Sequence, residues 1–331
     1  MAKDLPKFIR LDGDPQISPP YRFSNVSIQS FRLNAEKSIL RKFVVRQLNI
    51  GTEADRGFTY STDRDYVDLE VLTYGRMESD ADKPKRKIGS MTQHELYFRI
   101  LVDKREIDPE GASKSTETAI FIPYIFVDNN WSVIAGREVI GYPKMYAKFK
   151  KPFGGDNSKP PDPGFPWYTW TVATDVFHEY GDKDLKFLEF VKIEAKGGNK
   201  GQLSGTWPWV GDPSPQDSLV LGQSSTRKPT IQLKQILDAE NHDNDGEPND
   251  EFACYQALVH ADLEVTVEHA RDNPDPLTPA KITLTHHDSL PIGKVLGLKS
   301  EPTVISAYRV TCSSMLLKNT WNLFVLPPRV P

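Results

Sequence analysis

The sequence predicts an α+β protein built mainly from antiparallel β-strands, and three observations support this. Its 331 residues, 38% hydrophobic and 26% charged, suffice for a sizeable core in an ordinary globular composition. Short β-rich runs recur between turn signals. The 26 prolines are scattered and disfavour long uninterrupted helices. Because no flexible linker or fixed-period repeat interrupts the pattern, we expect one domain over residues 1–331.

The strands are predicted from alternation of apolar and polar residues. In "YVDLEVLTY" at 66–74, Val67, Leu69 and Val71 alternate with Asp68 and with further residues of the opposite face. Similar aromatic or β-branched runs are expected to form strands at 94–102, 119–127, 168–177, 186–195, 257–270 and 280–287.

Few segments have a helical pattern. Residues 34–44 place their large apolar side chains on one face. Residues 132–141 are expected to form a short helix, with Ser132 as its N-cap and Gly141 just beyond its C-terminus. Residues 229–238 remain ambiguous between helix and strand.

Charge and composition exclude several classes of partner. The formal net charge is −4, so nucleic acid is a poor candidate, and we interpret the basic run 83–87 as a loop. No apolar run approaches the roughly 18 residues of a membrane span. The charged start, residues 1–14, lacks an apolar signal core. Cys254 and Cys312 form neither a disulfide framework nor a metal motif. We therefore expect a cytoplasmic protein with reduced thiols.

Two polar motifs resemble metal sites but lack essential ligands. In 241–252, alternate acidic and amide side chains suggest a calcium loop, but Phe252 occupies the closing glutamate position, which favours an acidic turn. His286 and His287 are adjacent, so on a strand they would point to opposite faces, and we favour a structural role. The glycine-rich run 197–205 lacks the strand and helix context of a phosphate loop, and we interpret it as a turn.

Lys144, in "GREVIGYPKMYAKFK", has two interpretations. On a strand that begins at Pro143, Lys144 and Tyr146 would share a solvent face with later lysines, while Met145 would point inward. Alternatively, Lys144 is a nucleophilic amine held in an apolar pocket, where burial favours its unprotonated form. The pattern alone leaves both interpretations open.

The same segment resembles the active-site segment of the acetoacetate decarboxylase family. "FIPYIFVDNNWSVIAGREVIGYPK", residues 121–144, matches it in ungapped register, and Lys144 falls on the family's Schiff-base lysine. "PPYRFSN" and "AEKSILRKFV" are similar to the family's N-terminal strand and helix. The resemblance covers most of 19–150 and 228–328, whereas 151–227 matches poorly and looks longer.

The resemblance also assigns roles to further residues. Glu70 in "VDLEVL" and Glu95 in "QHELYF" fall on the family's two active-site glutamates, and Tyr142 adjoins the lysine. At the position of the family's second lysine the chain has Met145, which we expect to form part of the apolar lining of the site together with Tyr142. The family's carboxylate-binding arginine is replaced by Val26. Arg22 or Arg99 are candidate substitutes for that arginine.

The resemblance implies a cone-like, mostly antiparallel β-barrel with a flanking sheet, and a homo-oligomer. It implies a lyase in which Lys144 forms an imine with a small keto acid and a β-keto acid loses CO₂, with Glu70 and Glu95 moving protons. This chemistry needs no metal or organic cofactor. Two alternatives are retained: aldol, dehydration or hydration chemistry through the same imine, and a non-catalytic descendant that binds a small carbonyl compound.

Overall fold

A computed structural model describes residues 19–79, 89–107, 113–150, 169–194, 225–237, 253–272 and 280–326. The runs 83–87, 197–205 and 238–252 lie outside the described residues, as does the side chain of Cys254. Among the described residues, no helix combines the length and apolarity that a membrane crossing requires.

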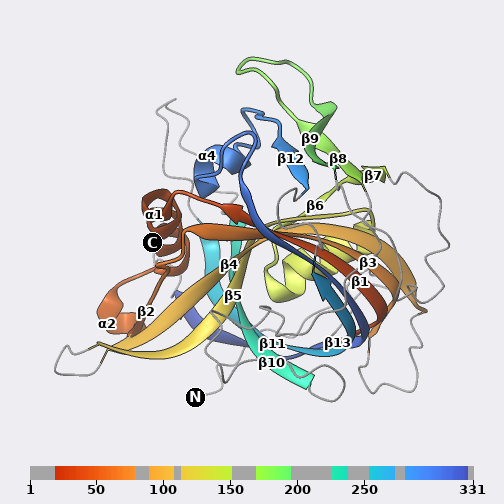
Figure 1. The fold of residues 1–331 in the computed structure, drawn as a ribbon. Coiled ribbons are helices and arrows are strands. Elements are labelled where there is room, and N and C mark those ends of the chain that lie inside the picture. Colours follow the sequence, from red (N-terminus) through yellow and green to blue (C-terminus); the bar gives the residue numbers. More distant parts are fainter. Residues whose placement is uncertain are drawn as a thin grey trace.

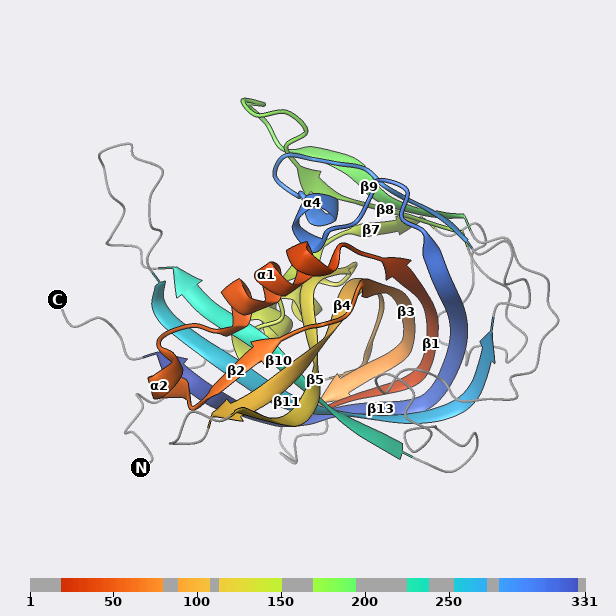
Figure 2. The ribbon, with the colours of Figure 1, turned by 60° about the vertical axis from the view of Figure 1, so that its left-hand side comes forward.

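A large mixed sheet, strongly curved, forms most of the fold (Figures 1 and 2). Its strands follow the order β2-β4-β3-β1-β13-β11-β10-β5-β6, and β4 also pairs with β5. Most neighbours are antiparallel, but β5 is parallel to both β10 and β6. The strands are β1 (Tyr21–Asn34), β2 (Phe58–Ser61), β3 (Tyr66–Ser79), β4 (Met91–Ile107), β5 (Ser113–Val127), β6 (Lys144–Tyr146), β10 (Ser225–Leu237), β11 (Ala253–Asp272) and β13 (Val304–Leu326).

The expected barrel is only partly supported by these pairings. β4 and β5 pair over most of their length, whereas β5 and β10 are joined by one residue pair, Ile120 with Thr230. The β-rich fold with a flanking sheet is confirmed, and closure of the barrel stays a prediction.

A smaller second sheet lies beside the large one (Figure 2). Its strand order is β12-β9-β8-β7, all antiparallel. The strands are β7 (Lys148–Lys150), β8 (Trp170–Val176), β9 (Lys186–Glu194) and β12 (Lys281–Leu284). The last of these ends before the two histidines, so the expected strand 280–287 is too long. His287 is buried and contacts the Glu189 carbonyl oxygen at 3.0 Å, which agrees with a structural role.

The helices are few and short, as expected. They are α1 (Lys37–Leu48), α2 (Glu53–Arg56), α3 (Asn130–Ala135), the π-helical turn η1 (Gly136–Ile140) and α4 (Ile292–Leu296). The ambiguous segment 229–238 lies largely in strand β10. The expected N-cap Ser132 is wrong, because Asn129 caps α3 by accepting hydrogen bonds from the amides of Trp131 and Ser132. Gly141 does end the helical segment, with φ of 85°.

Both faces of the large sheet are buried, which explains why polar residues of β3 are inside. The first core contains α1, Val67, Leu69 and Val71 of β3, and apolar side chains of the second sheet. The second core contains Leu72 and Tyr74 of β3 with apolar residues of β1, β5, β11 and β13 and of the α3–η1 segment. Charged residues that share the face of Leu72 are therefore enclosed by protein rather than exposed to solvent.

Candidate active site

Lys144 is buried in the second core, which excludes the surface-strand interpretation. Strand β6 runs parallel to β5, with Lys144 beside Ile125 and Met145 beside Phe126. Because in-register neighbours share a face, Lys144 follows Ile125 into the second core, while Met145 packs against the first. Lys144 is 8% exposed, in contrast to the exposed Lys148 and Lys150 on β7.

The amine of Lys144 contacts two polar groups. Its Nζ donates to Glu95 Oε2 at 3.0 Å and to Ser132 Oγ at 2.8 Å. Glu95 lies in the N-terminal part of β4, and Ser132 in the first turn of α3. The amine is thus held between the large sheet and the helical segment, within direct proton-transfer reach of a carboxylate.

Glu95 is itself fixed by two further donors. Tyr74 donates its hydroxyl to Oε1 at 2.8 Å, and Gln93 donates its amide to Oε2 at 3.1 Å. Burial first, and the charge of Glu95 second, raise the pKa of Tyr74 well above its ordinary value. The phenol therefore keeps its proton and remains a donor, so Glu95 has a defined orientation toward Lys144.

The backbone near Lys144 is shaped by the π-helical turn. Arg137 donates from a guanidinium nitrogen to the Lys144 carbonyl oxygen at 3.2 Å. Gly136 lies directly under the lysine stem: a Cβ on Gly136 would be 2.6 Å from Lys144 Cδ and 2.8 Å from Cε. Only glycine leaves room for this path of the side chain to Glu95 and Ser132.

Gly136→Ala is expected to displace the Lys144 amine and to slow any reaction of that amine by on the order of 100-fold, because displacements near 1 Å cost about that much. Gly136 has helical backbone angles, φ −65° and ψ −44°, so alanine fits the backbone and stability should not fall for conformational reasons. The rate of covalent labelling with a carbonyl compound and borohydride measures the effect. Glu138→Ala, in the exposed part of the same turn, is the control. Equal rates in both variants would contradict the steric argument.

A pocket opens at Lys144, and we call it the lysine pocket. Its volume of about 70 Å³ has room for on the order of five water molecules. Most of its wall is apolar, and the polar lining residues include Glu78, Glu95, Tyr97, Ser132, Tyr142 and Lys144. Among the lining residues that the structure describes, Lys144 carries the only positively charged side chain. The pocket suits a small molecule with one polar end.

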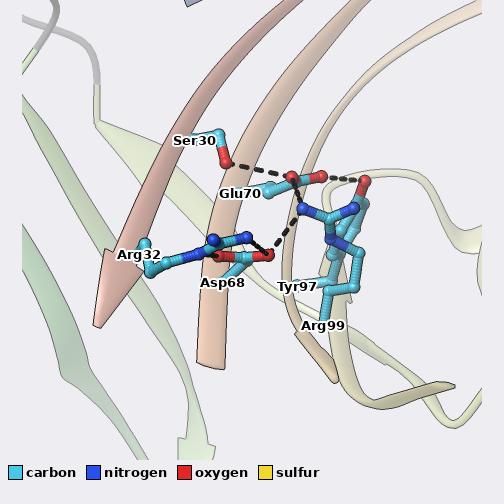
Figure 3. A network of polar contacts seen from close by, with 6 residues as sticks. All are labelled: Ser30, Arg32, Asp68, Glu70, Tyr97 and Arg99. Atoms are coloured by element: carbon cyan, nitrogen blue, oxygen red, sulfur yellow. Dashed lines mark hydrogen bonds and ion pairs between the residues drawn. The ribbon is translucent and has the colours of Figure 1, made fainter. Parts of the chain in front are cut away.

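Tyr97 connects the lysine pocket to Glu70, which is not among the lining residues. Glu70 is completely buried and accepts hydrogen bonds from the Tyr97 hydroxyl and from Ser30 Oγ, the latter at 3.0 Å (Figure 3). Arg99 Nη2 lies 3.0 Å from Glu70 Oε1. Burial raises the pKa of Glu70, and the Arg99 charge opposes this effect. The expected proximity to Lys144 is therefore found for Glu95, whereas Glu70 reaches the pocket through Tyr97.

Arg99 belongs to the same buried network. Its Nη2 also lies 2.7 Å from Asp68 Oδ2, and Arg32 Nε donates to Asp68 Oδ1 at 2.9 Å (Figure 3). Burial alone would lower the pKa of Arg99, but the Glu70 and Asp68 carboxylates outweigh it and raise that pKa. Two guanidinium groups thus face two carboxyl groups. Arg99 is not among the residues that line the lysine pocket, so the structure does not support its use as a substrate-binding arginine.

Three of the expected substrate-binding residues lie away from the pocket. Met145 lies on the face of β6 that packs against the first core, and it does not line the pocket. Arg22 alternates on β1 with Tyr21 and Phe23, which do line the pocket, so its side chain points to the other face. Val26 is completely buried in the second core and is not a lining residue. Tyr142 is the one of this group that lines the pocket.

Four contributors were missed from the sequence. Ser132 was interpreted only as a helix cap, and Gly136 and Arg137 only as part of a short helix. Tyr74 continues the alternation of Glu70 and Leu72 on β3, and that spacing could have placed it beside the glutamates. The roles of Ser132, Gly136 and Arg137 depend on how α3 and η1 fold over β6.

Part of the chain matches a known protein family. Residues 13–155, which include Lys144, Glu70 and Glu95, match the sequence model of acetoacetate decarboxylase (ADC). The resemblance predicted from the sequence is thereby confirmed. A search of curated proteins finds no match.

Solved structures show the same fold. Acetoacetate decarboxylase from Legionella pneumophila subsp. pneumophila str. Philadelphia 1 superposes with a TM-score of 0.53 at 16% identity, over 99% of this chain and 94% of that one. The enduracididine biosynthesis enzyme MppR, complexed with the condensation product of pyruvate and imidazole 4-carboxaldehyde, gives 0.54 at 13% identity, over 93% and 91%. An acetoacetate decarboxylase-like enzyme from Sphingomonas wittichii RW1 gives 0.54 at 12% identity, over 96% and 98%.

Proposed function

We propose that this protein is a lyase that forms an imine between Lys144 and a small keto acid. The proposal starts from the match of residues 13–155 to acetoacetate decarboxylase and from the fold, which is that of its solved structures. The observation that carries the proposal is the position of the Lys144 amine, buried and hydrogen-bonded to Glu95 at 3.0 Å in an apolar pocket. The first candidate reaction is decarboxylation of a β-keto acid.

The reaction begins with removal of a proton from Lys144, because only the free amine attacks a carbonyl carbon. Glu95, whose Oε2 lies 3.0 Å from the amine, is placed to accept this proton. The amine then adds to the ketone carbon and forms a carbinolamine. Protonated Glu95 returns a proton to the departing hydroxyl group, so that water leaves and a protonated imine remains.

The protonated imine acts as an electron sink. When the bond between the carboxylate carbon and the adjacent carbon breaks, its electron pair moves into the imine, and CO₂ and an enamine form. A proton then adds to the enamine carbon, and water releases the ketone from Lys144. Tyr97 and Tyr142 stay neutral, since burial raises the pKa of each. Their hydroxyl protons are directed to Glu70 and Thr230, so toward a substrate each hydroxyl oxygen can act as an acceptor.

A second candidate is condensation of pyruvate with an aldehyde through the same imine. One observation favours it. The related enzyme MppR has been crystallised with pyruvate and with a pyruvate condensation product. In this reaction the enamine attacks the aldehyde carbon instead of taking up a proton.

The experiment that tests the proposal is reductive trapping. The protein is incubated with acetoacetate or with pyruvate, reduced with borohydride and analysed by peptide mass mapping. We expect a mass adduct on Lys144. Release of CO₂ from acetoacetate then distinguishes decarboxylation from condensation, which is measured as loss of aldehyde in the presence of pyruvate. Labelling at other lysines, or at none, would leave the third interpretation, a non-catalytic binding protein.

Glu95→Gln is expected to slow trapping at Lys144 by roughly 10²- to 10⁴-fold, the usual contribution of a general acid or base. Glutamine retains an acceptor for Tyr74 but cannot take the lysine proton. Glu78→Gln is the matched control, because Glu78 also lines the pocket but pairs with Arg76 at 2.9 Å. We expect Glu78→Gln to change the trapping rate by less than about threefold, because the ion pair that this variant loses is partly exposed and such pairs contribute little energy. A similar loss in both variants would exclude a specific proton transfer by Glu95.

A further inference from the structure

A second cavity also has Tyr142 in its wall, and we call it the amide pocket. Tyr142 lines both pockets, and its hydroxyl lies 3.4 Å from Thr230 Oγ1 on β10. The amide pocket has a volume of about 240 Å³, compared with 70 Å³ beside Lys144. It is formed where α1 and η1 meet strands β5 and β10.

Gln232 is the unusual residue of this cavity. It is completely buried, yet neither its Nε2 nor its Oε1 has a hydrogen-bond partner among the described residues. A buried amide without partners is destabilising by roughly 1 to 3 kcal/mol for each unpaired group. Gln232 is a lining residue of the amide pocket, so an unpaired donor and an unpaired acceptor lie in the wall of a space that a ligand can fill.

The charge of the amide pocket is positive. Arg137 and Lys234 line it, and no aspartate or glutamate is among its described lining residues. Burial lowers the pKa of Lys234, and the nearby charge of Glu138 opposes this effect. Lys234 donates to the Glu138 carbonyl oxygen, and Arg137 donates to that of Lys144. Each cation retains further donors for an anion.

The remaining walls are aromatic. Phe43 and Phe121 stack with ring centroids 6.1 Å apart, and Tyr124 and Tyr142 complete this side. Burial raises the pKa of both tyrosines, so neither adds a negative charge. The pocket therefore combines an apolar, aromatic wall with two cations and one unsatisfied amide.

We propose that the amide pocket binds a small organic carboxylate that carries an aromatic or other apolar body and a hydroxyl group. The carboxylate lies against Arg137 and Lys234, the hydroxyl pairs with Gln232, and the apolar body contacts the aromatic wall. Such a ligand needs no carbonyl group, so binding at this site is independent of imine formation at Lys144 and of the function proposed above.

The probe is mandelate, which has a phenyl ring, a hydroxyl and a carboxylate but no ketone. Isothermal titration of the full chain compares it with phenylacetate, which lacks the hydroxyl, and with benzyl alcohol, which lacks the carboxylate. We expect phenylacetate to bind about fivefold to tenfold more weakly than mandelate, the value of one neutral hydrogen bond. We expect benzyl alcohol to bind at least about tenfold more weakly than mandelate. It lacks the carboxylate, and the hydrogen bonds of a carboxylate to Arg137 and Lys234 are stronger than those between neutral groups.

Three variants locate the binding. Gln232→Leu should abolish the preference for mandelate over phenylacetate and should raise the melting temperature of the ligand-free protein, since two unpaired polar atoms leave the interior. Lys234→Met should weaken both carboxylates about equally. Lys144→Met should leave mandelate affinity unchanged, because that residue lines only the lysine pocket.

Other results would overturn the proposal. If no probe binds and Gln232→Leu lowers the melting temperature, the amide is satisfied by water alone. If Lys144→Met removes mandelate binding while Gln232→Leu does not, the probe occupies the lysine pocket.

Discussion

Lys144→Met is expected to abolish covalent labelling by keto acids and borohydride, and to lower any turnover by at least about 10³-fold, as losses of nucleophiles do. Methionine has a similar length and no nucleophilic nitrogen, and its unbranched stem can follow the same path over Gly136. Glu95 keeps its hydrogen bonds from Tyr74 and Gln93 but loses its charged partner, so thermal unfolding must check that the variant is folded. Mass spectrometry after trapping measures the labelling, and a steady-state assay measures turnover.

Lys150→Met is the matched control, because Lys150 is exposed and pairs with the exposed Glu189 at 3.2 Å. Labelling should remain at the level of the unmodified protein. Substantial residual labelling in Lys144→Met, or an equal loss in Lys150→Met, would refute the assignment of Lys144 as the imine-forming residue.

Arg99→Met is expected to lower the free energy of unfolding by about 3–5 kcal/mol, the usual cost of leaving a buried charge without its partner. Arg99 lies 2.7 Å from Asp68 and 3.0 Å from Glu70, and all three side chains are almost fully buried (Figure 3). Asp68 keeps Arg32, but Glu70 would retain only neutral donors. Urea-induced unfolding measures the loss.

Two further variants test this explanation. Arg76→Met removes an exposed arginine that pairs with Glu78, and its effect should stay below about 1 kcal/mol. The double variant Arg99→Met/Glu70→Gln should recover part of the stability, since glutamine removes the uncompensated charge. If the double variant is no more stable than Arg99→Met, the loss comes from packing and not from charge.

The effect of Arg99→Met should depend on pH in a defined direction. Burial already raises the pKa of Glu70, and removal of Arg99 eliminates the charge that opposes this rise. The folded variant therefore holds the Glu70 proton at a pH where the unfolded chain releases it, and its stability falls as pH increases through that range. The stability difference between the two proteins should narrow toward acidic pH, as measured by unfolding at several pH values.

Much of the fold followed from local pattern. The strands at 66–74, 94–102 and 119–127 were found, and in 66–74 Val67, Leu69 and Val71 share a face as the alternation predicts. The resemblance in 121–144 identified Lys144 as a candidate. By contrast, the surface interpretation of Lys144 used the same alternation and was wrong, because a three-residue strand such as β6 takes its orientation from its partner β5.

Only the tertiary structure decided how the site is assembled. A sequence period of two does not indicate whether a face of a strand contacts water or protein. The burial of Glu70 and Asp68 is therefore decided by the tertiary structure, which covers both faces of the sheet. The sequence by itself determined the residue types, the strand periods and the lysine segment. The contacts of Lys144 with Glu95 and Ser132 required strand β4 and helix α3 to meet over β6. Glu95 and Ser132 precede the lysine by 49 and 12 positions, so they acquire their roles only through tertiary packing, which local periodicity does not encode.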